Sequence, residues 1–148
     1  MRKILLAMVA AGVLTAGEHP KLSVETLSEI QPGMGTVMME YGQRFWTLYY
    51  AAKAGNWKLA AYQLEEQLEI QEVGETTRPR YAAKLKAFEE AHLKTLEKAI
   101  EAKAFKVFDA AYAQAVEACN RCHEETGHGY IRYRLPATPP PYLDLEAK

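Results

Sequence analysis

The pentapeptide Cys119-Asn120-Arg121-Cys122-His123 constrains this chain more than any other feature, and it contains the only two cysteines of the 148 residues. In a helix, residues three and four apart lie on one face, so both thiols and the imidazole would point to the same side. Cys-x-x-Cys-His is the attachment signature of haem c, with two thioether bonds and an iron-binding histidine. The sequence therefore predicts one covalent haem c, attached at Cys119 and Cys122, with His123 as the proximal iron ligand. The fold must accommodate that group.

The same residues allow three other interpretations. A redox-active dithiol is expected near a strand–helix–strand pattern, and the sequence shows no such pattern. A zinc site could use Cys119, Cys122, His123 and His128, but these four ligands would lack the usual long spacer between ligand pairs. A structural disulfide between the two cysteines is the third alternative.

Four stretches of the chain carry apolar residues at steps of three and four, which is typical of amphipathic helices. We predict helices at about 34–54, 56–73, 80–102 and 104–125, with a break at Gly55-Asn56 and a loop over residues 74–79. The two cysteines lie on the core-facing stripe of the last helix. The four predicted stripes are Met34, Met38, Tyr41, Phe45, Leu48 and Ala52; Trp57, Ala61, Leu64 and Leu68; Leu85, Phe88, His92, Leu96 and Ala99; and Phe108, Tyr112, Ala115, Cys119 and Cys122.

Four amphipathic helices with short connections predict an all-α fold. The expected architecture is an antiparallel four-helix bundle with covalently bound haem near the C-terminus of the last helix. The length suits one domain. Residues 136–148 form a proline-rich tail, in which Pro139-Pro140-Pro141 favours polyproline geometry.

Residues 1–17 have the pattern of a secretory signal peptide. Arg2 and Lys3 precede an apolar run over residues 4–14, which is too short to span a bilayer comfortably, and small residues follow it. We therefore expect export to the bacterial periplasm and removal of this segment. Of the 18 basic and 19 acidic side chains, the leader contains two basic ones, which leaves 16 against 19 and a formal charge of −3. This balance argues against nucleic acid as a partner.

The pattern resembles the cytochrome c′ family, which consists of periplasmic four-helix bundles with one haem near the C-terminus. Residues 44–64 (RFWTLYYAAKAGNWKLAAYQL) and 119–131 (CNRCHEETGHGYI) are also similar to a related group of small exported monohaem cytochromes, whose members often end in a proline-rich tail. The resemblance implies that residues 18–135 form a cytochrome c′-like four-helix bundle. It leaves open a homodimer through the first two helices. It also implies redox partner proteins, in a respiratory chain or as a periplasmic oxidoreductase.

The second axial ligand of the iron decides the mechanism. The chain has no methionine after Met39, so a methionine ligand would come from the first predicted helix. The resemblance implies the same for the low-spin branch of the family. Met38 is our choice, because it lies on the core-facing stripe. Met34 one turn earlier, Met39 about 100° around the helix and His92 on the third helix are the other candidates, and ordinary core packing is the alternative for the methionines.

Two functions follow from the choice of ligand. If Met38 and His123 both bind iron, the protein is a six-coordinate, low-spin electron carrier. If the iron keeps an open position, it is a five-coordinate cytochrome c′ that binds small gases such as nitric oxide or carbon monoxide in an apolar distal pocket. We predict the carrier. The sequence shows no distal arginine–histidine pair or other proton-transfer set, so we do not expect an enzyme.

Overall fold

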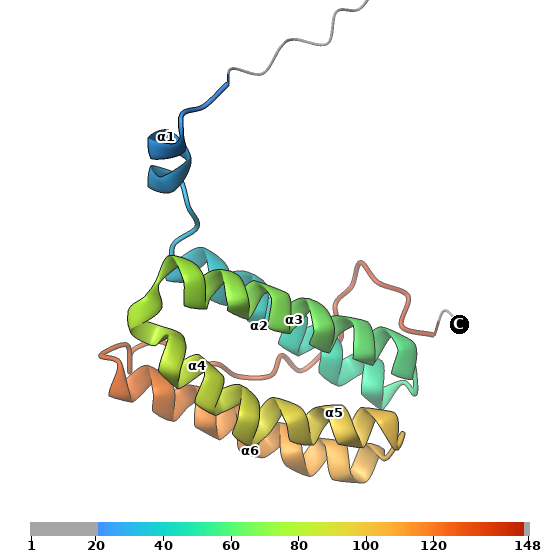
Figure 1. Cartoon of the computed structure of the whole chain (residues 1–148). Helices are drawn as coiled ribbons and strands as arrows, with labels where there is room; N and C mark the ends of the chain where they lie inside the picture. Colours follow the sequence, from blue (N-terminus) through green and yellow to red (C-terminus); the bar gives the residue numbers. More distant parts are fainter. Residues whose placement is uncertain (1–20, 147–148) are drawn as a thin grey trace, which may run out of the picture. The chain divides into compact units, whose positions relative to one another are not determined.

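The computed structural model describes residues 21–146, and within this range the chain is helical without any strand (Figure 1). The prediction of an all-α protein is confirmed. The chain divides into two units, residues 1–30 and 31–148. The first contains the short helix α1 (Val24–Glu29), which is capped by the Ser23 hydroxyl and has no buried residue. The predicted signal peptide, residues 1–17, lies outside the described residues.

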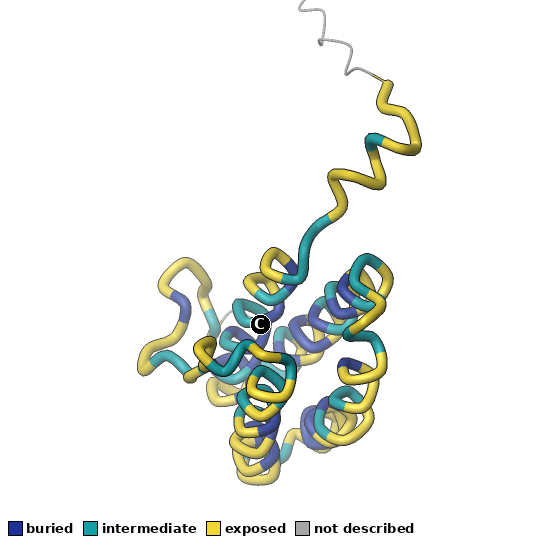
Figure 2. Tube along the Cα trace, turned by 90° about the vertical axis from the view of Figure 1, so that its left-hand side faces the viewer, coloured by how far each residue is buried: buried dark blue, intermediate teal, exposed yellow. Residues whose placement is uncertain are grey.

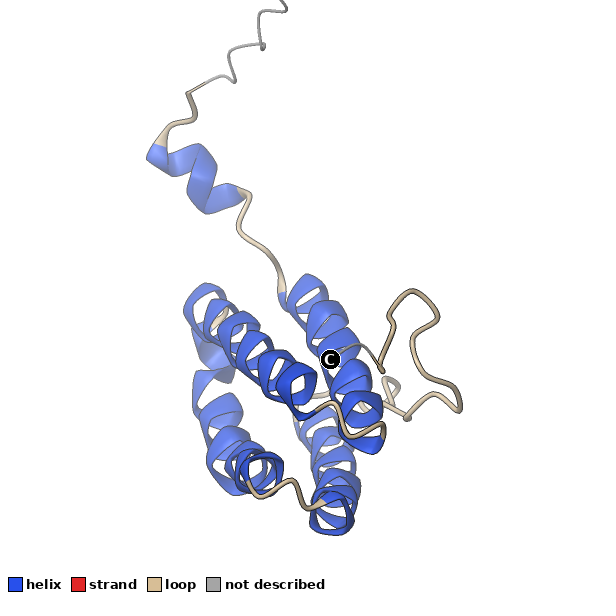
Figure 3. Ribbon diagram, turned by 90° about the vertical axis from the view of Figure 1, so that its right-hand side faces the viewer, coloured by secondary structure: helices blue, strands red, loops and turns tan. Residues whose placement is uncertain are grey.

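The second unit contains the Cys-x-x-Cys-His motif, and its helices form a closed ring of contacts. Helix α2 packs on α3, α3 packs on α4 and α5, α5 packs on α6, and α6 returns to α2 (Figures 1 and 3). A 3₁₀ turn, η1, leads into α4, and a π-helical segment, η2, joins α4 to α5 without a break. The bounds are α2 Met34–Lys53, α3 Trp57–Thr77, η1 Pro79–Tyr81, α4 Ala82–Phe88, η2 Glu89–Leu93, α5 Lys94–Glu101 and α6 Phe105–Glu125.

The buried residues of the helices form one apolar core (Figure 2). Phe45 of α2 stacks on Tyr112 of α6, with ring centroids 4.2 Å apart. Leu48, Leu96 and Phe108 are completely or almost completely buried beside them. Burying a side chain of this size contributes roughly 1.5–3 kcal/mol, so these contacts hold α6 and its cysteines against α2.

The predicted break between the first two helices is confirmed, but the predicted loop over residues 74–79 is wrong for residues 74–77, which are helical. Helix α3 continues to Thr77, and Gly74 is a buried helical residue. A Cβ atom at Gly74 would lie 3.0 Å from Cγ1 of Val37 and 3.4 Å from Cε of Met34. This glycine therefore permits close packing of α3 on α2, where we had interpreted it as a helix breaker. The chain turns instead at Arg78, and Pro79 opens η1, where its missing N–H costs nothing.

The third predicted helix, 80–102, is continuous but contains the π-helical segment η2. A π turn contains more residues than an α turn and changes which side chains face the core. Leu93 is buried at 1% exposure, whereas His92, which the constant helical period placed on the core-facing stripe, is half-buried. The predicted helix is therefore present, but His92 is less buried than its place on the predicted core stripe implied.

The proline-rich tail packs on α2. The indole Nε1 of Trp46 donates to the carbonyl of Thr138 at 2.9 Å, and the hydroxyl of Tyr50 donates to the carbonyl of Pro136 at 2.9 Å. Pro140 is fully buried. The tail therefore covers the outer aromatic side of α2 (Figure 3).

Candidate functional site

The last turns of α6 present the motif. Cys119 packs against the apolar core, and Cys122 follows one turn later, half-buried. The helix ends directly after the motif, because Gly127 adopts a φ of 80° that favours glycine. The hydroxyl of Thr126 donates to the carbonyl of Cys122 at 2.8 Å and satisfies part of the helix end. Both thiols are thus held on a rigid helix rather than on a loop.

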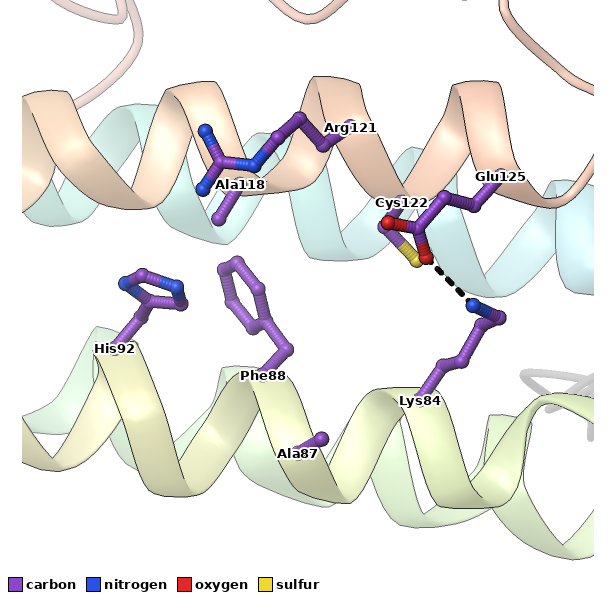
Figure 4. A pocket seen from close by; sticks show the side chains of 8 residues that line it. All are labelled: Lys84, Ala87, Phe88, His92, Ala118, Arg121, Cys122 and Glu125. Atoms are coloured by element: carbon purple, nitrogen blue, oxygen red, sulfur yellow. Dashed lines mark hydrogen bonds and ion pairs between the residues drawn. The ribbon is translucent and has the colours of Figure 1, made fainter.

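Cys122 opens onto a cavity of about 280 Å³ between α6 on one side and α4 and η2 on the other (Figure 4). Phe88 and His92 extend from α4 and η2 toward α6. An ion pair of 2.6 Å between Lys84 and Glu125 lies at the Cys122 end of the cavity. Cys119 faces the core and Cys122 faces this cavity, so the motif borders both spaces.

The state of the two thiols favours neither a structural disulfide nor a redox-active dithiol, which are two of the alternatives to haem attachment. Both cysteines are free, so the structure contains no disulfide between them. Burial, with a smaller contribution from Cys122, raises the pKa of Cys119 to about 12. Burial also raises the pKa of Cys122. Redox-active dithiols have lowered pKa values, so neither thiol has the character of a nucleophilic redox cysteine.

The zinc alternative required Cys119, Cys122, His123 and His128. Within residues 21–146, no group of three or more His, Cys, Asp or Glu side chains is arranged to hold a metal ion. The ring of His128 instead lies near Tyr81 and Tyr130.

His123 is held with one ring nitrogen occupied and the other available. Its Nδ1 lies 2.9 Å from the carbonyl oxygen of Ile131. A carbonyl only accepts hydrogen bonds, so Nδ1 carries the hydrogen and Nε2 has the free electron pair. Metal-binding histidines are oriented in this way by a second hydrogen bond. Sequence reasoning did not identify Ile131, because a backbone carbonyl leaves no signature in the side-chain pattern.

On α2, Tyr41 is more deeply buried than any of the three methionines. Tyr41 is 6% exposed, and its hydroxyl donates to Oε1 of Gln71 at 3.4 Å. Burial first and Cys119 second raise the pKa of Tyr41 well above its usual value of 10.0, so the phenol stays protonated. We had assigned Tyr41 to core packing only.

The three methionines of α2 lie in different environments. Met39 is 77% exposed, Met38 is half-buried, and Met34 packs beside Gly74 of α3. Val37 is the fully buried position of this part of α2. Met38 as the distal ligand stays a prediction, and the exposure of Met39 makes that residue the weaker candidate.

A stripe of buried glutamines on α3 was not recognised in the sequence. Gln63, Gln67 and Gln71 follow at steps of four and are all at most 5% exposed. Gln67 lies near the Tyr41 hydroxyl and partly counteracts the rise of its pKa, which burial dominates. Neither Nε2 nor Oε1 of Gln67 makes a regular hydrogen bond with any residue in the described part of the chain. An unpaired buried amide costs about 1–3 kcal/mol, so this amide has capacity for a further partner.

His92, the other candidate ligand, lines the same cavity as Cys122. Its ring lies 5.2 Å from that of Phe88. Burial and then the positive charge of Arg121 lower the pKa of His92. The structure therefore brings His92 to the motif, although from the cavity side and not from the apolar core.

Comparisons with protein-family models, with curated proteins and with solved structures find no match for this chain. Among the described residues, no helix combines the length and apolar character that crossing a membrane requires.

Proposed function

We propose that the protein is an exported monohaem c-type cytochrome that transfers electrons, with haem c attached at Cys119 and Cys122. The observation that carries this proposal is the hydrogen bond from Nδ1 of His123 to the Ile131 carbonyl, which leaves Nε2 free for iron. The haem supplies an iron that alternates between the ferric and ferrous states. The chain supplies the two thiols, the orientation of the imidazole and the exclusion of water.

The residues around the motif fit such a group. The thiols are free, they are presented by one helix, and the cavity beside Cys122 offers access to its sulfur. The unpaired amide of Gln67 provides hydrogen-bonding capacity in the interior. The closed ring of helix contacts supports an antiparallel four-helix bundle of the cytochrome c′ type, in which cofactors are held by facing helices.

Met38 is proposed as the distal ligand of the carrier. A methionine that stays bound in both oxidation states keeps the iron low-spin and raises its reduction potential. Replacing Met38 with Ala should convert the iron to high spin and lower the potential, as absorption spectra and redox titration would record. Met39→Ala is the matched control, because this neighbouring side chain is 77% exposed. An unchanged spectrum for Met38→Ala would exclude Met38 as a ligand.

Gas binding is the second candidate, and the position of Tyr41 favours it. Tyr41 is buried on α2, and its hydroxyl is occupied by the bond to Oε1 of Gln71. Burial keeps its pKa raised, so the phenol would be a poor iron ligand, and without a methionine the iron would keep an open position. In that case the chain would bind nitric oxide or carbon monoxide instead of carrying electrons.

Two measurements test the proposal in sequence. The first is the mass and absorption spectrum of the protein from a host that attaches haem c, compared with Cys119→Ala and Cys122→Ala. Each variant should lose one thioether bond, and the double variant should carry no covalent haem. Haem held through two thioethers in either single variant would contradict the assignment.

The second measurement is the ferrous spectrum before and after addition of carbon monoxide. Sharp bands that carbon monoxide does not change indicate methionine ligation and an electron carrier. A broad spectrum that carbon monoxide shifts indicates an open iron position and the gas-binding function. The export proposal is tested separately by the N-terminal sequence of the protein recovered from the periplasm, which should begin near residue 18.

The proposed partners are redox proteins of the periplasm. The homodimer through the first two predicted helices stays a prediction. Because Trp46 and Tyr50 donate to carbonyls of the tail, that part of α2 is already covered within one chain. Sedimentation of the haem-bound protein would measure its oligomeric state.

A further inference from the structure

Asn120, the first of the two variable residues in the motif, is hydrogen-bonded at both ends of its amide. Its Nδ2 donates to the carbonyl of Tyr133 at 3.1 Å, and its Oδ1 accepts from the N–H of Tyr133 at 2.8 Å. Both bonds are partly shielded from solvent. One side chain on the haem-binding helix therefore holds both polar groups of one backbone residue in the segment that follows the helix.

The segment held in this way contains the carbonyl that orients the predicted iron ligand. Ile131 lies two residues before Tyr133, and its oxygen accepts from Nδ1 of His123 at 2.9 Å. Between them, Arg132 pairs with Glu124 of α6 at 2.7 Å, but both side chains are more than half exposed, and such pairs contribute little. Helix α6 therefore provides two partly shielded anchors for this stretch: the Tyr112 hydroxyl bonds the Tyr133 side chain, and Asn120 bonds the Tyr133 backbone.

We propose that Asn120 is a positioning residue for His123. By fixing Tyr133 it keeps the Ile131 carbonyl on Nδ1, which selects the tautomer that leaves Nε2 for the iron and sets the electron donation of the imidazole. This inference rests on the proposed haem c and adds a residue that determines its reduction potential. It holds for the electron carrier and for the gas binder, because His123 is the proximal ligand in both.

The geometry explains why the residue is asparagine. A side chain that bonds both the N–H and the C=O of one residue needs a donor and an acceptor on one short, rigid group. Serine has one hydroxyl, and alanine has neither group. Aspartate keeps the acceptor for the Tyr133 N–H but loses the donor and adds a negative charge near the iron. Asn120→Ala therefore removes both bonds with the smallest additional change.

The expected effect follows from the direction of the hydrogen bond. Donation from Nδ1 to a carbonyl makes the imidazole more basic, and a more basic ligand stabilises the ferric state. Loosening the Ile131 carbonyl should therefore favour the ferrous state and raise the potential. Outer-shell substitutions at metal sites change affinity by about 10–100-fold. The lower limit, a tenfold change in the ferric/ferrous ratio, corresponds to about 59 mV for a one-electron couple.

The test is a redox titration of four haem-bound proteins: wild type, Asn120→Ala, Arg121→Lys and Tyr133→Phe. Arg121→Lys is the matched control, since it changes the other variable residue of the motif and keeps the positive charge beside the cavity. Tyr133→Phe removes a second anchor of the same segment, the 2.9 Å bond between the hydroxyls of Tyr133 and Tyr112. Both Asn120 bonds go to the Tyr133 backbone and remain in this variant, so it should lower stability without moving the potential. Nitrogen NMR of the His123 ring reports the tautomer independently of the potential.

A raised potential and faster solvent exchange of the Nδ1 hydrogen in Asn120→Ala alone would support the inference. If two thioethers form but Asn120→Ala has the potential of the wild type and of Arg121→Lys, Asn120 does not position His123, and the proposed function stands. If the wild-type protein takes up no covalent haem, the proposed function fails and this inference fails with it. Should Asn120→Ala not fold, Asn120→Ser replaces it in the test. One hydroxyl replaces at most one of the two bonds, so this variant should also raise the potential and speed the exchange of the Nδ1 hydrogen.

Discussion

Replacing Gly74 with Ala tests the close packing of α3 on α2. The added methyl group would lie 3.0 Å from Cγ1 of Val37, which is shorter than an ordinary van der Waals contact. Val37 is completely buried and β-branched, so its side chain has almost no alternative rotamer in a helix. Met34, the other neighbour at 3.4 Å, is flexible and can move aside.

The two opposing contributions can be estimated. Glycine in a helix interior is about 1 kcal/mol less favourable than alanine, so the substitution gains that amount from the backbone. Overpacking a well-packed contact costs about 1–3 kcal/mol. Because the rigid Val37 makes the tighter contact, the upper part of this range applies, and Gly74→Ala should lower the free energy of unfolding by about 1–2 kcal/mol.

Gly42→Ala is the matched control, because Gly42 also lies inside a helix and an added Cβ would meet only Tyr133, at 3.9 Å. This variant should raise the free energy of unfolding by up to about 1 kcal/mol. Urea unfolding of both haem-bound variants, followed by circular dichroism, measures the difference. Equal stabilisation by both substitutions would refute the close approach of α3 to α2 at Gly74.

Three further predictions concern the surroundings of the site. Burial, and then the charge of Arg121, lower the pKa of His92 from 6.5. The contribution of His92 to stability is therefore fully present above about pH 6.5 and is lost as the pH falls below that value. His92→Gln should reduce the dependence of the free energy of unfolding on pH below about 6.5. Deleting the chain after Leu135 should lower the melting temperature and increase proteolysis around Trp46, and unchanged protection would contradict the packing of the tail on α2. Gln67→Leu should stabilise the haem-free double cysteine variant by about 1–3 kcal/mol, and a smaller or reversed effect in the haem-bound protein would identify the haem as the partner of the amide.

The sequence was sufficient for the helices whose apolar residues follow one constant period. For α2 and α6 the predicted bounds, 34–54 and 104–125, differ from the structure by one residue at most. The prediction failed where local composition and packing disagree. Gly74 lies in a stretch whose composition is typical of a loop, but a close contact between two helices requires a glycine there. Nothing in the sequence around Gly74 indicates that Val37 is its neighbour.

The π-helical segment shows a different limit. A constant helical period assumes one angle per residue, and a π turn changes that angle locally. Within η2, His92 is half-buried while its neighbour Leu93 is 1% exposed, whereas Leu96 and Ala99, which follow η2, are buried as their place on the predicted stripe implied. His92 therefore lines the cavity beside Cys122 instead of the apolar core.

The two sides of the candidate site differ in how far the sequence determines them. On the proximal side, the spacing of Cys119, Cys122 and His123 fixes the face of one helix, and the structure adds the Ile131 carbonyl that selects the tautomer. On the opposite side, every candidate comes from another element, and its distance from His123 depends on how α2 and α3 pack. Tyr41 and the amide of Gln67 lie close together in the interior. In the proposed gas binder they would make the distal pocket polar instead of purely apolar, because a protonated phenol and an amide can both donate to a bound ligand. An electron carrier with Met38 on iron would use the same two donors differently, since a bound thioether sulfur is a weak acceptor. The proposed choice between Met38 and an open iron position would therefore depend on how α2 packs, and the methionine spacing alone does not determine it.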